Sequence, residues 1–236
     1  MLSFLRKFRW KKQSDGKVRK YFFYALGEII LLVIGILLAL EINNWNQARL
    51  NKKSELKYYQ NIKRQLNEDV QGLNATIDFN NRFIDQFAYA SQIIELNDRT
   101  KKDTLGSIAV NLTEFSDFHR KSNIYETLVG SGEVKLIENS SLIESLQTLE
   151  ATYIYINRLE LSHAEGIKEL VVSDLRRALK FNTLEVKQPD LLYSYEFQNL
   201  FVLLSEHMRE KDAIYHRALK QIQSIMEILD RELQNQ

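Results

Sequence analysis

Few residues in this chain have the type and spacing that chemistry requires. Glu160 and His163 form a Glu-x-x-His pair, a spacing that places both side chains on one face of a helix. Di-iron sites in helical bundles need two such motifs and two further carboxylates, and the second motif is missing here. Glu206, His207 and His216 could in principle complete a site. We instead expect Glu160 and His163 to be an interior polar pair, with the histidine hydrogen-bonded to a glutamate.

Motifs of known enzyme classes are absent from the sequence. It has no Gly-rich nucleotide loop, no G-x-S-x-G, no H-E-x-x-H and no calcium loop. Cysteine is also absent, which excludes thiol nucleophiles, disulfides and thiolate metal sites. The pair Ser131-Gly132 has no strand-turn-helix context, so we interpret it as a turn or helix C-cap. We therefore expect no catalytic residues, no cofactor and no enzymatic activity.

A long apolar run dominates the first fifth of the sequence. Tyr21–Ile42 is about 22 residues long, or roughly 33 Å of helix, which suffices to cross a hydrocarbon core. Tyr21 and Tyr24 lie at one end and Trp45 at the other, where aromatic side chains favour the membrane interface. A cleavable signal peptide is the alternative, but small residues at a cleavage spacing are missing around residues 40–42. The run predicts a retained transmembrane helix over residues 21–42.

Basic residues flank this run unevenly, although the net charge of the whole chain is only +1. Residues 1–20 hold Arg6, Lys7, Arg9, Lys11, Lys12, Lys17, Arg19 and Lys20, whereas only Arg49, Lys52, Lys53 and Lys57 follow closely after the run. Because Lys and Arg are retained on the inner side, residues 1–20 should be a basic cytoplasmic segment and the rest should be periplasmic. Basic residues mixed with aromatics can also indicate nucleic-acid binding, but next to a span they suit a lipid surface better.

One acidic residue lies inside the predicted span. Glu28 shares a helical stripe with Gly35 and Ala39, and Gly35-x-x-x-Ala39 is a small-xxx-small spacing that lets two helices approach closely. These three residues are therefore candidates for transmembrane association. Glu28 also lies near the helix N-terminus, where the dipole and the headgroups tolerate a negative charge. A proton- or cation-handling role is a third interpretation.

Beyond the span, the apolar pattern predicts an all-α fold. A single proline and eight glycines leave few turn residues, which favours long helices over short strands. Residues 43–97 keep a seven-residue phase and predict a stalk that becomes the first bundle helix. The remaining residues, 98–236, predict an antiparallel helical bundle with two more long helices, at about 142–179 and 191–233, and short helices within 104–138. The segments 97–103 and 183–190 are expected to be loops.

The predicted core follows from these periods. The seven-residue repeat comprises Ile42, Leu56, Val70, Ile77 and Ile84, with Trp45, Tyr59, Leu66, Leu73, Phe87 and Ile94 three residues later. Because Arg49, Lys52 and Lys63 interrupt it just outside the span, we expect the helix to join a bundle or coiled coil from about Leu56 onward. The second long helix carries Leu142, Leu146, Leu149, Tyr153, Ile156, Ile167 and Leu170 on one face. The last carries Phe201, Leu204, Met208, Tyr215, Ala218, Ile222, Ile225 and Leu229.

Two motifs resemble those of a known family. They are KYFFYALGEIILLVIGILLALEINNWN, over Lys20–Asn46, and YETLVGSGEVKLI, over Tyr125–Ile137. Together with the C-terminal helical pattern, they resemble a family of single-pass membrane proteins from Bacteroidota that is classified only as a domain of unknown function. The resemblance implies a bacterial inner-membrane protein with a periplasmic helical domain. It implies no activity, cofactor or catalytic residue.

These observations support three functional hypotheses. The first is a non-enzymatic scaffold or protein-interaction module on a membrane anchor, whose partners are the lipid bilayer and either copies of itself or other envelope proteins, with no nucleic acid. The second is a periplasmic sensor of an unidentified small molecule that acts through a partner, since twenty cytoplasmic residues leave no room for an output domain. The third is an ion-handling oligomer that uses Glu28.

Overall fold

The computed structural model describes residues 3–120 and 123–234, with side chains from residue 19 onward except at 124. The side chains of the predicted basic segment up to residue 18 therefore lie outside this description. The chain divides into two compact units, Met1–Ser54 and Glu55–Gln236. The second unit begins within the segment predicted as stalk and first bundle helix.

A single helix, α1 (Ser3–Glu95), contributes to both units. In the first unit, every residue from 19 to 50 is exposed except Gly27, which is half-buried. This helix contains one stretch that is long and apolar enough to cross a membrane, and none of that stretch is buried. Its apolar side chains thus have no cover from the described part of the chain.

The second unit is helical almost throughout, which confirms the predicted fold class. After α1 come η1 (Arg99–Lys101), α2 (Lys102–Val110), η2 (Asn111–Thr113), α3 (Ile124–Ser131), η3 (Glu133–Leu136), α4 (Ser140–Gly166), the π-helical turn η4 (Ile167–Val171), α5 (Val172–Ala178), β1 (Leu179–Lys180), β2 (Glu185–Val186), α6 (Pro189–Leu192) and α7 (Tyr195–Gln234).

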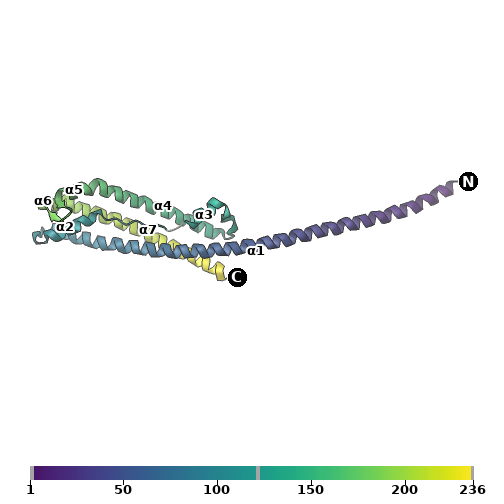
Figure 1. Ribbon diagram of the computed structural model, residues 1–236, viewed down its shortest axis with the longest axis horizontal. Coiled ribbons are helices and arrows are strands. Elements are labelled where there is room, and N and C mark those ends of the chain that lie inside the picture. Colours follow the sequence, from purple (N-terminus) through teal and green to yellow (C-terminus); the bar gives the residue numbers. More distant parts are fainter. Residues whose placement is uncertain (1–2, 121–122, 235–236) are drawn as a thin grey trace. The chain divides into compact units, whose positions relative to one another are not determined.

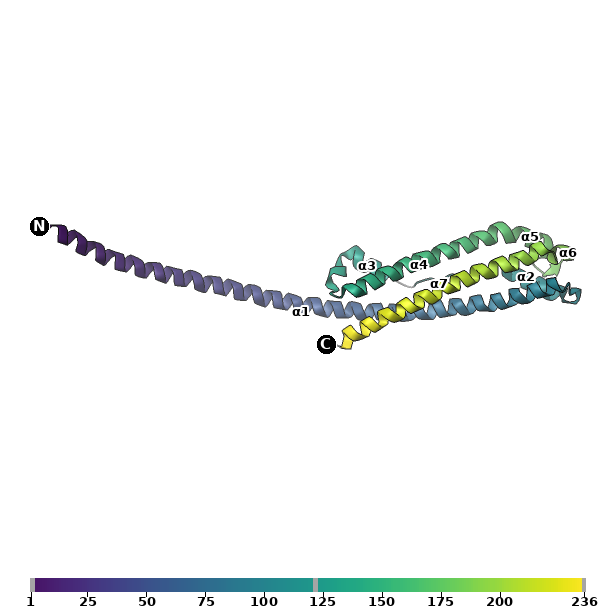
Figure 2. The same ribbon diagram turned by 180° about the vertical axis from the view of Figure 1, so that it is seen from behind.

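Three long helical segments form the bundle: the second half of α1, α4 with its extension into α5, and α7. Figures 1 and 2 show α4 and α7 running side by side. Helix α7 is antiparallel to the other two, whereas α1 and α4 run in the same direction. They do so because the connecting chain, described over residues 96–120 and 123–139, returns along the bundle before α4 begins (Figure 1). This return places an extended segment, residues 114–120, among the helices.

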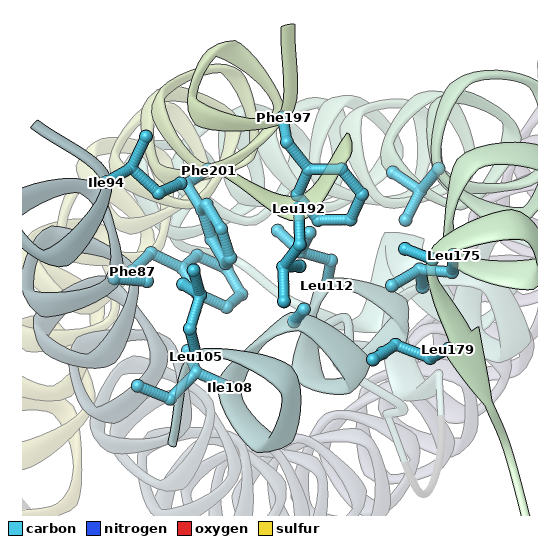
Figure 3. Packing of buried hydrophobic residues seen from close by; sticks show 14 of the residues in the cluster. Phe87, Ile94, Leu105, Ile108, Leu112, Leu175, Leu179, Leu192, Phe197 and Phe201 are labelled. Atoms are coloured by element: carbon cyan, nitrogen blue, oxygen red, sulfur yellow. The ribbon is translucent and has the colours of Figure 1, made fainter. Parts of the chain in front are cut away.

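Buried side chains form two hydrophobic clusters, one toward each end of the bundle. The hairpin cluster joins α1, α2, the η4–α5 region, β1, β2, α6 and the start of α7. Figure 3 shows its packing, including Phe87 of α1, Leu105 of α2 and Phe201 of α7. The C-terminal cluster joins the Tyr59–Ile77 part of α1 to α4 and the second half of α7. Every residue of the stripe predicted on the last helix is buried, so that prediction is confirmed.

Helix ends follow the local sequence. The Asn139 side chain accepts a hydrogen bond from the Leu142 amide at 3.0 Å and caps the start of α4. Gly132 ends α3 with φ of +73°, as predicted for a C-cap glycine. Leu170, in contrast, was predicted on the interior face but is 48% exposed. The π turn widens the helix there, so Val171 takes the buried position that follows Ile167.

A short antiparallel hairpin, β1–β2, follows α5. Its first strand begins at Leu179, the last residue of the predicted second long helix, and its second strand lies within the predicted loop 183–190. Leu179 pairs with Val186, and both side chains are buried in the hairpin cluster. Two-residue strands are too short to show a period in the sequence. The hairpin packs closely on α2, since a Cβ atom on Gly106 would lie 2.8 Å from Val186 Cγ2.

We predict that Gly106→Ala destabilises the protein by about 1–3 kcal/mol, because the buried side chains of Val186 and Leu179 must shift to admit the methyl group. Gly130→Ala is the matched control, since it lies in α3 with no atom within 4 Å of its Cβ position. The control should gain about 0.4–1 kcal/mol through reduced freedom of the unfolded chain. Urea unfolding followed by circular dichroism measures both variants. Equal stability of the two would contradict the packing described for the hairpin.

Candidate functional site: a buried polar layer beside a cleft

A layer of buried polar side chains separates the two hydrophobic clusters. The polar layer consists of Asn80 of α1, Glu160 and His163 of α4, and Lys211 and Asp212 of α7, each at most 9% exposed. On every helix these residues fall between the cluster members that precede and follow them. Charged groups this deeply buried normally require partners, so their contacts define what the layer can do.

Glu160 holds the extended segment in place. Its Oε1 accepts a hydrogen bond from the Phe118 amide at 2.8 Å and another from the Tyr215 hydroxyl at 2.6 Å. Burial raises the pKa of the Glu160 carboxyl, and these two hydrogen bonds oppose the rise. The Tyr215 hydroxyl also lies 3.3 Å from the Ser116 hydroxyl. Glu160 therefore links α4, α7 and the segment 114–120.

Lys211 holds the same segment from the opposite helix. Its ammonium group donates to the Ser116 carbonyl oxygen at 3.3 Å. Burial lowers the pKa of Lys211 to about 8, and the negative charges of Glu160, Asp212 and Asp117 limit this decrease. Asp212 in turn accepts a hydrogen bond from the Asn80 side chain at 2.6 Å.

The expected hydrogen bond between His163 and a glutamate does not form. Both residues of the predicted pair are buried, but Glu160 is engaged by Phe118 and Tyr215. Neither His163 ring nitrogen has a hydrogen-bond partner among the described residues. Its ring instead stacks on His207, with ring centroids 5.7 Å apart. Burial lowers the pKa of His163 to about 3, and the positive charges of Lys211 and His207 contribute.

The other residues considered for a metal site do not converge on this pair. Glu206 is exposed and pairs with Arg209, and His216 is also exposed. Within residues 3–120 and 123–234, no group of three or more His, Asp or Glu side chains is placed to hold a metal ion. His207 is the one residue of the three that reaches His163, and it does so by ring stacking.

A cleft of about 550 Å³ opens beside the polar layer. One wall is the segment 114–120 and the other is α4; the lining residues are Phe115, Asp117, Phe118, His119, Arg120, Asn157, Glu160, Leu161 and Ala164. The Asp117 Oδ1 and the His119 Nδ1 lie 3.2 Å apart, and both residues are exposed. Glu160 is the one buried ionisable residue among these described lining residues, so its carboxyl group lies deepest in the cleft.

The segment 114–120 is anchored at its far end by a second polar cluster. The Arg120 guanidinium donates two hydrogen bonds to Glu150, at 2.6 and 3.0 Å, and lies 4.6 Å from the centre of the Tyr153 ring. The Tyr153 hydroxyl donates to Asp69 at 2.8 Å. The Phe118 ring packs against Gly72, where a Cβ atom would approach it to 3.0 Å. The wall of the cleft is thus fixed at several points.

Sequence reasoning missed Lys211, Asp212 and Asn80. The signal was present, because Lys211 and Asp212 lie between Met208 and Tyr215 at the helical spacing of the apolar stripe. Asn80 occupies the seven-residue position shared by Leu73 and Phe87. A polar residue in phase with a core stripe is the pattern that would have identified the layer.

The candidate residues of the predicted span all face outward. Glu28 and Ala39 are exposed, and nothing lies within 4 Å of a Cβ atom placed on Gly35. The three aromatic residues expected at the membrane interface, Tyr21, Tyr24 and Trp45, are exposed as well. Their roles in association and at the interface remain predictions.

The fold and the site together define a helical bundle with a buried, charged layer, attached to an apolar helix. The chain belongs to the family of unknown function DUF6090, whose model matches residues 28–207. The matched range holds most of the first motif and the whole of the second motif on which the resemblance rested. Neither the curated proteins nor the solved structures contain a match to the chain.

We predict that His163→Leu makes the protein more resistant to acid. Because the folded-state pKa of His163 lies below its ordinary value of 6.5, the unfolded chain takes up this proton first as the pH falls. The wild type therefore loses stability from about pH 6.5 down to about pH 3, and the loss reaches about 2 kcal/mol at pH 5.

Urea unfolding of the wild type and His163→Leu at pH 7.5 and pH 5 tests this expectation. The stability difference between the two proteins should shift by about 2 kcal/mol in favour of the variant at the lower pH. Buried carboxyl groups such as Glu160 and Asp212 change the stability in the opposite direction as the pH falls. Because both proteins contain them, their contributions cancel in the stability difference between the wild type and the variant. A difference that is the same at both pH values would show that His163 takes up its proton normally in the folded protein.

Proposed function

We propose that this chain is a single-pass protein of a bacterial inner membrane, whose helical bundle is a non-enzymatic scaffold or protein-interaction module. The observation that carries the proposal is the uncovered apolar surface of α1. Leu31 is 71% exposed and Ile42 is 66% exposed, and the residues between them are exposed too. Removing each such side chain from water gains about 1.5–3 kcal/mol, so a bilayer is the favoured surrounding.

The proposed orientation places residues 1–20 in the cytoplasm and the bundle in the periplasm. The excess of Lys and Arg before the span supports it. The resemblance to Bacteroidota membrane proteins supports a bacterial envelope. The absence of enzyme motifs supports a non-catalytic role, as do the buried Glu160 and Lys211, which are engaged in holding the segment 114–120.

Cysteine labelling tests the orientation, since the wild type contains no cysteine. We predict that Ser141→Cys, which is exposed at the start of α4, reacts with a membrane-impermeant maleimide in spheroplasts. Ser14→Cys should react only after lysis, because the bilayer separates it from the reagent. The reverse labelling pattern would show that the topology is inverted. Labelling of both cysteine variants without lysis would exclude a spanning helix.

Self-association through the span is the mode of assembly that we propose for the scaffold. No described residue covers the surface around Gly35 and Ala39, so a second helix could approach it closely. Glu28 lies on the same stripe near one end of the span, where a charged carboxylate costs less than the roughly 2.5–3.5 kcal/mol that insertion scales give at the bilayer centre. Glu28 is therefore tolerated in the membrane and is not the source of the association.

We predict that the full-length protein in nanodiscs is a defined oligomer by native mass spectrometry, and that a fragment lacking residues 1–46 is a monomer. Gly35→Leu should convert the full-length protein to monomer by blocking close approach of the helices. Val33→Leu is the matched control, as it adds bulk on another side of the same helix. Glu28→Gln should leave the oligomer unchanged; dissociation of that variant would favour the ion-handling hypothesis. A monomeric wild type would end the self-association proposal.

A further inference from the structure

The cleft beside the polar layer has the features of a ligand site, and this inference goes beyond the scaffold role. Its floor holds Glu160, which is 4% exposed. Both hydrogen bonds that this side chain accepts from described residues go to Oε1. The carboxylate is therefore fixed in orientation by the Phe118 amide and the Tyr215 hydroxyl, and Oε2 is the oxygen left for a ligand.

The charges around this floor favour a cation. Three carboxyl groups, those of Glu160, Asp117 and Asp212, act on the single ammonium group of Lys211. Asp117 also lies close enough to Glu160 for its negative charge to disfavour ionisation of that carboxyl. Arg120, the one guanidinium among the described lining residues, already makes a bidentate pair with Glu150. His119, the other basic residue of the described lining, has its Nδ1 3.2 Å from Asp117 Oδ1, so an anion would find no uncommitted basic side chain among these residues.

The remaining lining residues favour an organic ion over a metal ion. Phe115, Leu161 and Ala164 give the cleft an apolar side, with Leu161 65% exposed and Phe115 39% exposed. Among the described lining residues two are carboxylates, Asp117 and Glu160, whereas calcium takes six to eight oxygen ligands. An alkyl chain can cover the apolar side while its charged end reaches the floor, and aromatic faces also attract cations.

We propose that this cleft binds a small organic ammonium ion. Its N–H groups donate hydrogen bonds to Glu160 Oε2 and to the Asp117 carboxylate, and its carbon chain lies on Phe115 and Leu161. Asn157, at the edge of the cleft, adds a further oxygen acceptor. The two hydrogen bonds to Oε1 make the acceptor preorganised, so the ligand does not have to order the Glu160 side chain on binding.

Isothermal titration calorimetry of the full-length protein in phosphatidylcholine nanodiscs tests this proposal, with n-butylammonium chloride as the probe. We expect saturable binding of butylammonium, and no binding of butanol or butyrate, which have the same carbon chain without the positive charge. Glu160→Gln should weaken binding at least tenfold, because the amide keeps the two accepted hydrogen bonds but turns an N–H group toward the cleft. Glu165→Gln is the matched control on an exposed position of α4 and should bind as the wild type does.

A second variant keeps the test valid if Glu160→Gln does not fold. Leu161→Arg introduces a cation at an exposed position of the cleft wall and should abolish binding, whereas Ile154→Arg, exposed elsewhere on α4, should not. Absence of butylammonium binding, equal binding by Glu160→Gln, or binding of calcium chloride in place of the amine would each overturn the proposal. In nanodiscs of phosphatidylethanolamine, a weaker apparent affinity would point to a lipid headgroup as the source of the ammonium group. An unchanged affinity would point to a soluble amine, and both results keep the ammonium assignment.

Discussion

Removal of apolar helix surface from water is the constraint on which both units of this chain depend. In the second unit, one face of α1 packs against α4 and α7. Most of the buried residues of α1 belong to the two hydrophobic clusters. In the first unit the same helix carries a stretch of apolar side chains that the described residues leave uncovered. The same physical term thus explains the packing of the bundle and the proposed membrane anchor.

The bundle has a polar layer at its middle because three helices and one extended segment must be joined there. Residues 114–120 have no regular hydrogen-bonded partner strand or helix, so their buried backbone groups need side-chain partners. Glu160 accepts from the Phe118 amide and Lys211 donates to the Ser116 carbonyl oxygen. Burying these charges is costly, and the cost is offset only while the segment stays in place. The same arrangement creates the cleft and fixes the carboxylate on its floor.

Sequence periodicity was sufficient for the elements whose burial is continuous. The last helix is the clearest case, because a stripe from Phe201 to Leu229 at helical spacing can only be satisfied by a long buried face. The caps at Asn139 and Gly132 were also predictable, since they depend on backbone groups within three or four residues. The hairpin and the exposure of Leu170 were not, because a two-residue strand has no period and a π turn shifts the phase without a distinct residue pattern.

The sequence by itself determined that the chain is helical, that it contains an apolar stretch of membrane length, and that Glu160 and His163 lie on an interior face. Each of these properties depends on spacing along one helix. Only the tertiary structure decided what these residues contact: Glu160 bonds to Phe118 and Tyr215, and His163 stacks on His207 without a hydrogen bond. Residues 42 and 55 positions apart along the chain form the contacts of Glu160. No local pattern encodes such a pairing, because it arises from the path of the chain that brings residues 114–120 alongside α4 and α7, and from the competition among donors for one buried carboxylate.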